Sequence, residues 1–287
     1  MPADQTRLYD DVALLTSLQP ARNYLNLESL NRAADYIKAE FEQLRGIVAE
    51  QAFEADGRHY RNIIASFGPP GAARIIIGAH YDVCGDQPGA DDNASAVAGL
   101  LETARLLHQH LPSLKYRVDF VAYPNEEPPY FATEHMGSAV HAKALHDAGV
   151  PVRGMLCYEM IGYFSNAPGS QHFPDELLAA RYPSVGNFII VVGKMGQEAF
   201  TQQIQQGMQA RAGSLDVQQI SLPESMALAK LSDHRNYWTY GYDAVMINDT
   251  SFLRNPNYHE PTDTIDTLDF ARMAQVVNGV YGALLAL

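Results

Sequence analysis

The run from Arg74 to His80, RIIIGAH, is the feature that most restricts the possible folds of this chain. Its centre is apolar without interruption, whereas a strand with one face in solvent alternates apolar and polar residues. A continuous apolar strand is typical of a sheet that helices cover on both faces. The rest of the chain therefore has to supply helices for two layers.

Segments with helical spacing and segments typical of strands alternate along the sequence. Helices are expected at residues 26–44, 94–111, 136–148, 197–212 and 267–287, and strands at residues 48–53, 60–67, 74–80, 116–123, 152–159, 187–192, 217–220 and 244–248. This alternation predicts the α/β class, as a three-layer α/β/α sandwich with a mostly parallel, mixed central sheet. Residues 163–186 and 249–264 form two long loops, which serve either as walls of an active site or as surface excursions.

Length, charge and cysteine content set further bounds. No repeat or linker divides the 287 residues, so we expect one domain over residues 1–287. The net charge of −13 disfavours nucleic acid and anionic membrane as partners, because phosphate binding needs clustered Lys and Arg. No signal peptide is recognisable, and no segment approaches the roughly 20 apolar residues of a membrane span. With Cys84 and Cys157 alone, the sequence predicts a cytoplasmic protein with reduced thiols.

Side chains suited to catalysis or metal binding gather where the predicted strands end. They are His80 and Asp82, Asp91 and Asp92 in the next loop, Glu126 and Glu127, Glu159, and His259 in the second long loop. Singly, each has a plain role: a buried polar histidine, a helix cap or a solvated turn. Ligands of such sheets bind beyond the carboxyl ends of the strands, so the convergence of these groups on that edge favours a functional site.

The charges of these groups point to metal ions. Carboxylates crowded at one sheet edge repel one another and take up protons unless cations lie among them. Two divalent ions resolve this, and mixed imidazole and carboxylate ligands suit zinc, with cobalt or manganese as alternatives. Asp82 lies two residues after His80, on the same face of the strand, where its carboxylate can orient the imidazole.

Several short motifs, spread over nearly the whole chain, carry a family resemblance. They are GAHYD at 78–82, GADDNASA at 89–96, NEEPPYF at 125–131, YEMIGY at 158–163, SDHRNYW at 232–238 and NYHEPTDT at 257–264. In these residues and their order, the chain resembles the two-zinc aminopeptidases of the aminopeptidase Y type, a family that includes glutaminyl cyclases and glutamate carboxypeptidases. The resemblance implies a zinc-exopeptidase-like fold and a single metallopeptidase catalytic domain.

The resemblance also implies roles for individual residues. One zinc ion would be held by His80, Asp92 and Glu159, and the other by Asp92, Glu127 and His259, with Asp92 as the bridge before a cis peptide to Asn93. Glu126 would be the general base and Asp82 a catalytic residue that supports His80. Asp233, His234 and Tyr258 would line the substrate pocket or support the ligands. Many relatives have aspartate at the position of Glu159, whose extra methylene lengthens the reach of this ligand.

The expected function is therefore that of a zinc-dependent aminopeptidase, which removes N-terminal residues from peptides with a free N-terminus. A metal-bridging water would attack the peptide bond, and Glu126 would carry the proton. Two alternatives stay open at this point. A glutaminyl-peptide cyclotransferase with a single zinc shares much of the motif set. A non-catalytic binding module on the same scaffold is disfavoured, because all the expected ligands and the base are present.

Overall fold

The computed structural model describes residues 2–110 and 114–287. Its helices are α1 (Gln5–Ser17), α2 (Leu27–Glu42), α3 (Ala96–His110), α4 (Gly137–Asp147), α5 (Glu176–Arg181), α6 (Glu198–Gln209), α7 (His234–Trp238) and α8 (Phe270–Ala286). Its strands are β1 (Ile47–Ala55), β2 (Arg58–Phe67), β3 (Arg74–His80), β4 (Arg117–Tyr123), β5 (Val152–Glu159), β6 (Phe188–Lys194), β7 (Asp216–Leu222) and β8 (Ala244–Asn248).

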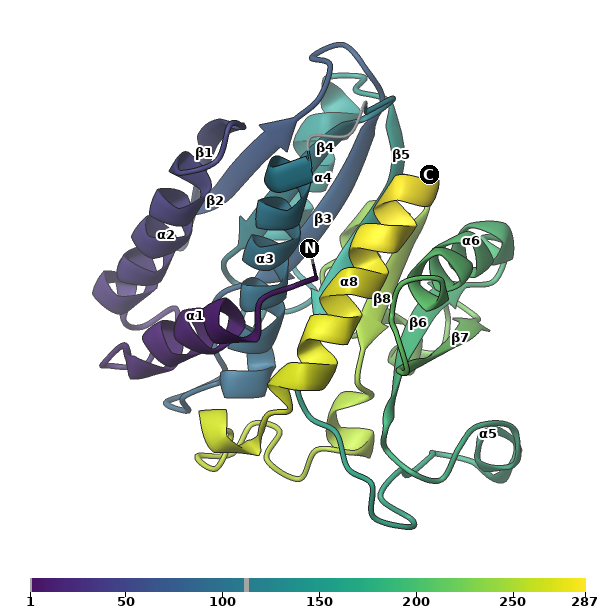
Figure 1. The fold of residues 1–287 in the computed structure, drawn as a ribbon. Helices are drawn as coiled ribbons and strands as arrows, with labels where there is room; N and C mark the ends of the chain where they lie inside the picture. The colour runs from purple at the N-terminus through teal and green to yellow at the C-terminus, as the bar shows by residue number, and fades with distance from the viewer. Residues whose placement is uncertain (1, 111–113) are drawn as a thin grey trace.

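The strands form one 8-stranded sheet in the order β1-β2-β4-β3-β5-β8-β6-β7 (Figure 1). The central strands β4, β3, β5 and β8 run parallel to one another. On one side, β2 is antiparallel to both β1 and β4, and on the other side β6 is antiparallel to β8. The predicted mixed sheet of an α/β protein is thus confirmed. β3 lies between β4 and β5, so the carboxyl ends of these three strands meet at one edge.

Helices cover both faces of the sheet, as the apolar centre of β3 requires. Helices α1, α2, α3, α6 and α8 pack against one face and enclose the larger apolar cluster, which includes Leu8, Ile37, Leu101, Ile204 and Val277 (Figure 1). Helices α4 and α7 pack against the other face, with Leu145 and Trp238 in a second cluster. The predicted three layers are therefore confirmed.

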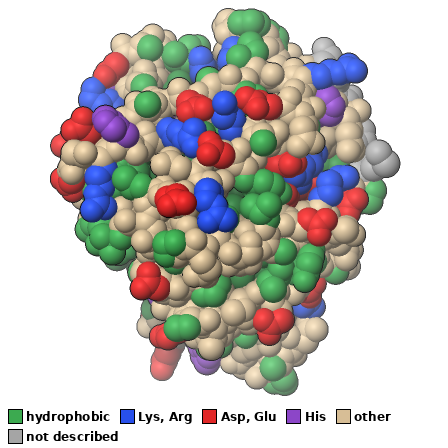
Figure 2. All heavy atoms as spheres, turned by 90° about the vertical axis from the view of Figure 1, so that its left-hand side faces the viewer, with side chains coloured by type: hydrophobic (Ala, Val, Ile, Leu, Met, Phe, Trp, Pro, Cys, Tyr) green, Lys and Arg blue, Asp and Glu red, His purple; other side chains and the backbone are tan. Residues whose placement is uncertain are grey.

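The edge strand β1 and the neighbouring α2 expose charges of both signs on one face of the molecule (Figure 2). Lys38 of α2 pairs with Glu50 of β1, and Asp35 of α2 pairs with Arg61 of the next strand, β2. Charged side chains along an edge strand hinder its pairing with another chain. Among the described residues, no helix combines the length and the apolar character needed to cross a bilayer.

Some local structure differs from the sequence-based expectation. Helix α1 was not predicted, although Leu8, Val12 and Leu15 have helical spacing, and Asp4 caps it by accepting the N–H groups of Thr6 and Arg7. The helix expected at 94–111 begins at Ala96, after a turn at Ala90–Ser95 that is kinked at Asp92 and Asn93, and its expected end at 111 lies outside the described residues. The loop 163–186 contains the short helix α5, and the SDHRNYW motif contains α7.

Candidate metal centre

The structure brings the predicted site residues together at the carboxyl ends of the central strands. His80 is the last residue of β3 and Glu159 the last of β5, while Glu126 and Glu127 follow β4. Asp92 lies in the kinked turn Ala90–Ser95 between β3 and α3, and His259 in the loop after β8. Five separate chain segments therefore supply one cluster, because adjacent parallel strands place their ends side by side.

Asp92 stands between two groups of possible ligands. Its Oδ1 lies 3.4 Å from His80 Nε2, and that nitrogen lies 3.4 Å from Glu159 Oε2. Its Oδ2 lies 3.1 Å from His259 Nε2, which in turn lies 3.4 Å from Glu127 Oε2. One carboxylate thus presents a different oxygen to each of two histidine and glutamate pairs. This is the arrangement of a ligand shared by two ions.

Several possible metal-ligand atoms of this cluster are buried and form no hydrogen bond with any residue that the structure describes. The atoms without a partner are both ring nitrogens of His80, Asp92 Oδ1, Glu126 Oε1, Glu127 Oε1 and His259 Nε2. Buried polar atoms without partners are costly and need an explanation. Imidazole nitrogens and carboxylate oxygens are ligands that zinc accepts. The residues present therefore fit the metal centre that the sequence predicted.

The pKa values reflect the crowding of these carboxylates. Burial and the charge of Asp92 raise the pKa of Glu127 to about 8. Burial raises the pKa of Glu126 well above its usual value, and Glu159 and Glu127 add to the effect. Burial opposes the charged form of His80, yet Glu159, Glu126 and the aspartates outweigh it and raise the pKa of this imidazole. Such mutual repulsion among buried anions favours a site for cations.

Asp82 contacts more of the cluster than the sequence indicated. Its Oδ1 lies 3.4 Å from His80 Nδ1, as expected for a residue that orients the ring. Its two oxygens also accept the backbone N–H groups of Glu126, at 3.2 Å, and Glu127, at 3.1 Å. One buried carboxylate therefore fixes a histidine and the backbone of both glutamates.

Two residues that sequence reasoning missed hold Glu159. The hydroxyl of Ser232 donates to Glu159 Oε2 at 2.5 Å, and the side-chain amide of Asn248 donates to the Glu159 carbonyl oxygen at 2.7 Å. Ser232 is the first residue of the SDHRNYW motif, and Asn248 is the last residue of β8, so their positions offered a weak signal. The Ser232 bond fixes the side chain of Glu159, and the Asn248 bond fixes its backbone.

The turn that carries Asp92 is tied to two other segments. The carboxylate of Asp263 accepts the N–H groups of Asp91, at 2.8 Å, and Asp92, at 3.0 Å. Asp91 does not cap α3 but accepts the N–H of Gly162, at 2.9 Å, beyond the end of β5. The peptide between Asp92 and Asn93 is cis, as the resemblance implied. Asp263 was not predicted.

The backbone is strained next to the candidate ligands. Asn125, directly before Glu126, has φ 65°, Met160, directly after Glu159, has φ 46°, and His259 itself has φ 58°. Residues other than glycine rarely adopt this left-handed backbone conformation, which costs of the order of 1–3 kcal/mol. Strain of this kind persists where the surrounding contacts enforce it, and it occurs often at functional sites.

The remaining predicted residues lie around the cluster. Asp233 is buried, accepts the hydroxyl of Ser138 at 2.5 Å, and has its pKa raised to about 7 by burial. His234 is buried, with Nε2 2.7 Å from the Ala229 carbonyl oxygen and its ring packed edge-on against Trp238. The ring of Tyr258 stacks on His259 with 3.8 Å between centroids.

Cys84 also lies at this site, although the sequence suggested only a reduced thiol. It is unpaired and half-buried. Its sulfur and possible ligand atoms of Glu127 and His259 lie within 4.8 Å of one another. The thiol is therefore close to the half of the cluster that contains His259.

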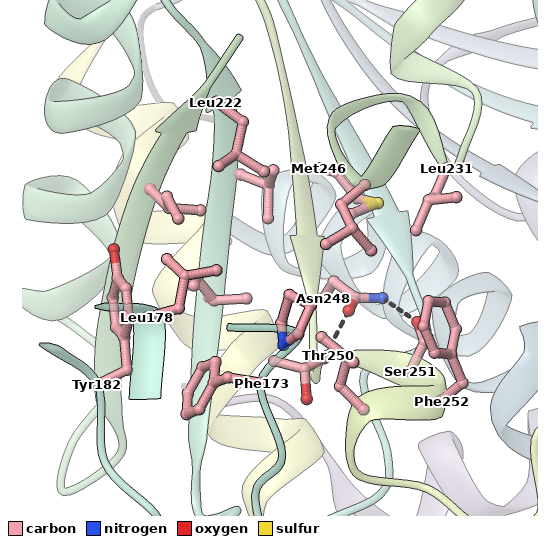
Figure 3. A pocket seen from close by; sticks show the side chains of 16 residues that line it. Phe173, Leu178, Tyr182, Leu222, Leu231, Met246, Asn248, Thr250, Ser251 and Phe252 are labelled. Atoms are coloured by element: carbon pink, nitrogen blue, oxygen red, sulfur yellow. Dashed lines mark hydrogen bonds between the residues drawn. The ribbon is translucent and has the colours of Figure 1, made fainter. Parts of the chain in front are cut away.

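An apolar pocket opens at β6, β7 and β8, beside Asn248 (Figure 3). Its lining comes from the two long loops, from β6, β7 and β8, and from the segment before Ser232, and it includes Phe173, Leu178, Tyr182, Leu222, Leu231, Met246 and Phe252. Asn248 also lines it and bonds to Glu159, so the pocket adjoins the candidate metal centre. Both loops predicted as walls of a site thus contribute to one cavity.

Hydrogen bonds fix the wall of this pocket. Asn248 Oδ1 accepts the N–H of Thr250 at 2.5 Å, and its amide donates to Ser251 Oγ at 2.8 Å (Figure 3). The side chain of Gln171 joins the first loop to the second, because it donates to Thr250 Oγ1 and accepts from Arg254 Nε, both at 2.9 Å. The pocket is therefore held in shape before any ligand enters.

A three-layer α/β/α sandwich with imidazole and carboxylate groups at the carboxyl ends of its central strands is typical of metal-dependent hydrolases. This chain belongs to peptidase family M28, whose family model matches residues 62–283. It is 44% identical to the uncharacterized protein YfbL of Escherichia coli over 97% of this chain and 87% of that protein. It is 26% identical to leucine aminopeptidase 1 of Arthroderma otae over 77% of this chain and 56% of that protein.

Solved structures share the fold. The LapA aminopeptidase of Legionella pneumophila superposes with a TM-score of 0.80 at 18% identity, over 99% of this chain and 72% of that one. The glutaminyl cyclase of Porphyromonas gingivalis gives 0.74 at 20% identity, over 98% of both chains. The chain spans about half the length of the curated leucine aminopeptidase that it matches. The suspected family is thus confirmed.

Proposed function

We propose that this chain is a metal-dependent aminopeptidase that hydrolyses the N-terminal residue from peptides with a free N-terminus. The observation that carries the proposal is the position of Asp92 between the pairs His80–Glu159 and His259–Glu127, with Glu126 beside them. Glu126 is 5% exposed, and its Oε2 lies 3.8 Å from His80 Nε2. A two-metal hydrolase needs one carboxylate that both ions share, here Asp92, and a neighbouring carboxylate that binds neither ion, here Glu126.

In this proposal, His80, Asp92 and Glu159 hold one zinc ion, and Asp92, Glu127 and His259 hold the other; cobalt or manganese would fit the same ligands. When bound, the ions supply an acidified water and stabilise negative charge on the oxygen of the scissile carbonyl. Ser232 and Asn248 fix Glu159, so the first group of ligands is preorganised. Peptide is the expected partner.

Glu126 acts as the general base in this scheme. Its carboxylate accepts a proton from the attacking water and returns it to the leaving amine. Glu127 is occupied as a ligand, and Asp82 holds the backbone of both glutamates. Glu127 and the Asp82 bonds would fix the position of Glu126, while its own carboxylate stays free to accept the proton.

The apolar pocket supports a preference for substrates whose N-terminal side chain is apolar. It adjoins Glu159 through Asn248 and is lined by leucine, methionine and aromatic residues. An apolar side chain such as leucine or phenylalanine gains binding free energy when it leaves water for such a lining. A charged N-terminal side chain would lose its hydration there without gaining a partner.

Glutaminyl-peptide cyclisation at a single zinc is the second candidate. The observation in its favour is the match with a glutaminyl cyclase over 98% of both chains. The apolar lining beside Glu159 favours the first candidate, because a glutamine side chain would need polar partners there.

A substrate panel with metal analysis tests the proposal. Protein loaded with zinc is assayed with leucine and glutamate anilides and with a peptide that begins with glutamine. We expect release of aniline from the leucine compound and two zinc ions per chain. Cyclisation of the glutamine peptide without anilide cleavage would favour the second candidate and contradict the first.

A further inference from the structure

Arg235 is a cation at the site that the proposed mechanism does not use. It is half-buried in the first turn of α7, and its guanidinium carbon lies 5.0 Å from the ring centroid of Phe131. Phe131 ends the NEEPPYF segment that contains Glu126. Arg235 Nη1 donates to the Lys230 carbonyl oxygen at 3.2 Å. Among the described residues, no carboxylate forms an ion pair with it.

Arg235 stands beside the segment that carries the base, because its guanidinium packs on Phe131, five residues after Glu126. Burial lowers the pKa of Arg235, and the negative charge of Glu126 is the influence that opposes this effect. The segment directly before α7 is also joined to the candidate metal centre, because Ser232 donates to Glu159. Phe131 holds the guanidinium in place by a cation–π contact while leaving its remaining N–H groups available.

The proposed mechanism decides which part of a substrate lies near Arg235. The N-terminal side chain enters the apolar pocket beside Leu231 and Asn248. Glu126 returns a proton to the leaving amine, so the residue after the scissile bond lies on the side of Glu126. In a dipeptide, that residue carries the free C-terminal carboxylate two bonds from the leaving nitrogen. A carboxylate in this position comes within the field of Arg235.

We propose that Arg235 binds the C-terminal carboxylate of dipeptides and that this chain acts preferentially on dipeptides with an apolar N-terminal residue. The inference rests on the proposed aminopeptidase function. Guanidinium and carboxylate form paired, charge-assisted hydrogen bonds, which supply affinity and orientation. A longer peptide has an uncharged amide at this position, so it buries the cation without compensation. Arg235 thus selects for substrate length.

The test compares three substrates in the zinc-loaded enzyme: Leu-Ala, Leu-Ala amide and leucine anilide. The readout is kcat/KM for release of leucine. We expect Leu-Ala to be preferred over its amide by tenfold or more, with the difference mainly in KM. In Arg235→Met, this preference should fall to near unity. Arg235→Lys should retain part of it, because lysine keeps the charge but not the paired geometry.

Arg153→Met is the matched control. Arg153 also stands over an aromatic ring, that of Phe200 at 5.6 Å, but it lies near the start of β5, away from the carboxyl edge. It should keep the wild-type ratio of acid to amide. Equal turnover of Leu-Ala and its amide by the wild type would overturn the inference, whether or not Arg235→Met folds. An unchanged ratio in a folded Arg235→Met would also overturn it. Cleavage of the anilide together with equal turnover contradicts only the role of Arg235, whereas cleavage of none of the three contradicts the aminopeptidase function as well.

Discussion

The carboxylate of Asp82 accepts the backbone N–H of Glu127 at 3.1 Å and, through its other oxygen, the N–H of Glu126 at 3.2 Å. The same carboxylate lies 3.4 Å from His80 Nδ1. Asp82 therefore links the end of β3, which carries the proposed ligand His80, to the segment after β4. That segment carries the proposed ligand Glu127 and the proposed base Glu126. A residue that touches neither substrate nor metal can control the geometry of the whole centre in this way.

Replacing Asp82 with asparagine should lower activity without unfolding the chain. An amide oxygen can serve one backbone N–H, but the amide nitrogen cannot accept the other. We expect kcat/KM to fall by about 10- to 100-fold, as for other residues that orient metal ligands. Assay of the zinc-loaded variant checks this. Asp147→Asn, at an exposed site on α4, is the control, and equal activities of the two variants would contradict the assigned role.

Ser232→Ala should weaken binding of one metal ion. The variant loses the 2.5 Å bond that holds Glu159 Oε2, so this long side chain gains freedom. We expect zinc affinity at this position to fall about tenfold. Competition with a chromophoric chelator measures it, and Ser17→Ala, at an exposed helix end, is the control. Identical zinc affinities in both variants would show that Ser232 does not position the ligand.

Metal removal should destabilise the chain as well as inactivate it. Ions that bind only the folded state add to its stability, and they compensate the repulsion among Glu126, Glu127 and Glu159. A strong chelator should therefore lower the melting temperature and abolish anilide cleavage, and zinc or cobalt should restore both. Full activity of protein shown by metal analysis to contain no metal would exclude the proposed centre.

Acid should destabilise the fold partly through His141, a buried residue of α4. Burial lowers its pKa to about 4, and Nδ1 lies 2.7 Å from the hydroxyl oxygen of Tyr237. An unfolded histidine titrates near 6.5, so the unfolded state binds the additional proton between these values. The stability due to neutral His141 is complete above pH 6.5 and declines as the pH falls toward 4.

His141→Gln should therefore reduce the loss of stability in acid. Between pH 6.5 and pH 5, the wild type should lose about 1.6 kcal/mol more than the variant, because the slope at pH 6.5 is half of its full value of about 1.4 kcal/mol per pH unit. Urea unfolding at a series of pH values measures the difference. Parallel stability curves for the two proteins would show that His141 does not titrate as its burial implies.

Much of the fold and the cluster could be predicted because the signals are local. The apolar run that ends at His80 identifies a central strand, and the ends of such strands indicate where His80 and Glu159 lie. Helix α1 has an equally local signal in the spacing of Leu8, Val12 and Leu15, although it was not predicted. These features depend on neighbours within a few turns or along one strand.

The supporting contacts could not be predicted, because they join distant parts of the chain. Ser232 and Glu159 are 73 positions apart, and Asp263 and Asp92 are 171 apart. A serine or an aspartate in a loop has many possible partners, and only the folded topology selects one. The double role of Asp82 was hidden for the same reason, since its backbone partners lie 44 and 45 positions away.

The central claim, that Glu126 carries the proton in a metal-dependent peptidase, is tested most directly by Glu126→Gln. Glutamine is similar in size and shape but cannot accept the proton from water at neutral pH. The variant should bind as much zinc as the wild type and melt at a similar or higher temperature, because it removes one buried negative charge. Its kcat for leucine anilide should fall at least 100-fold. Near-normal turnover at full zinc content would contradict the account.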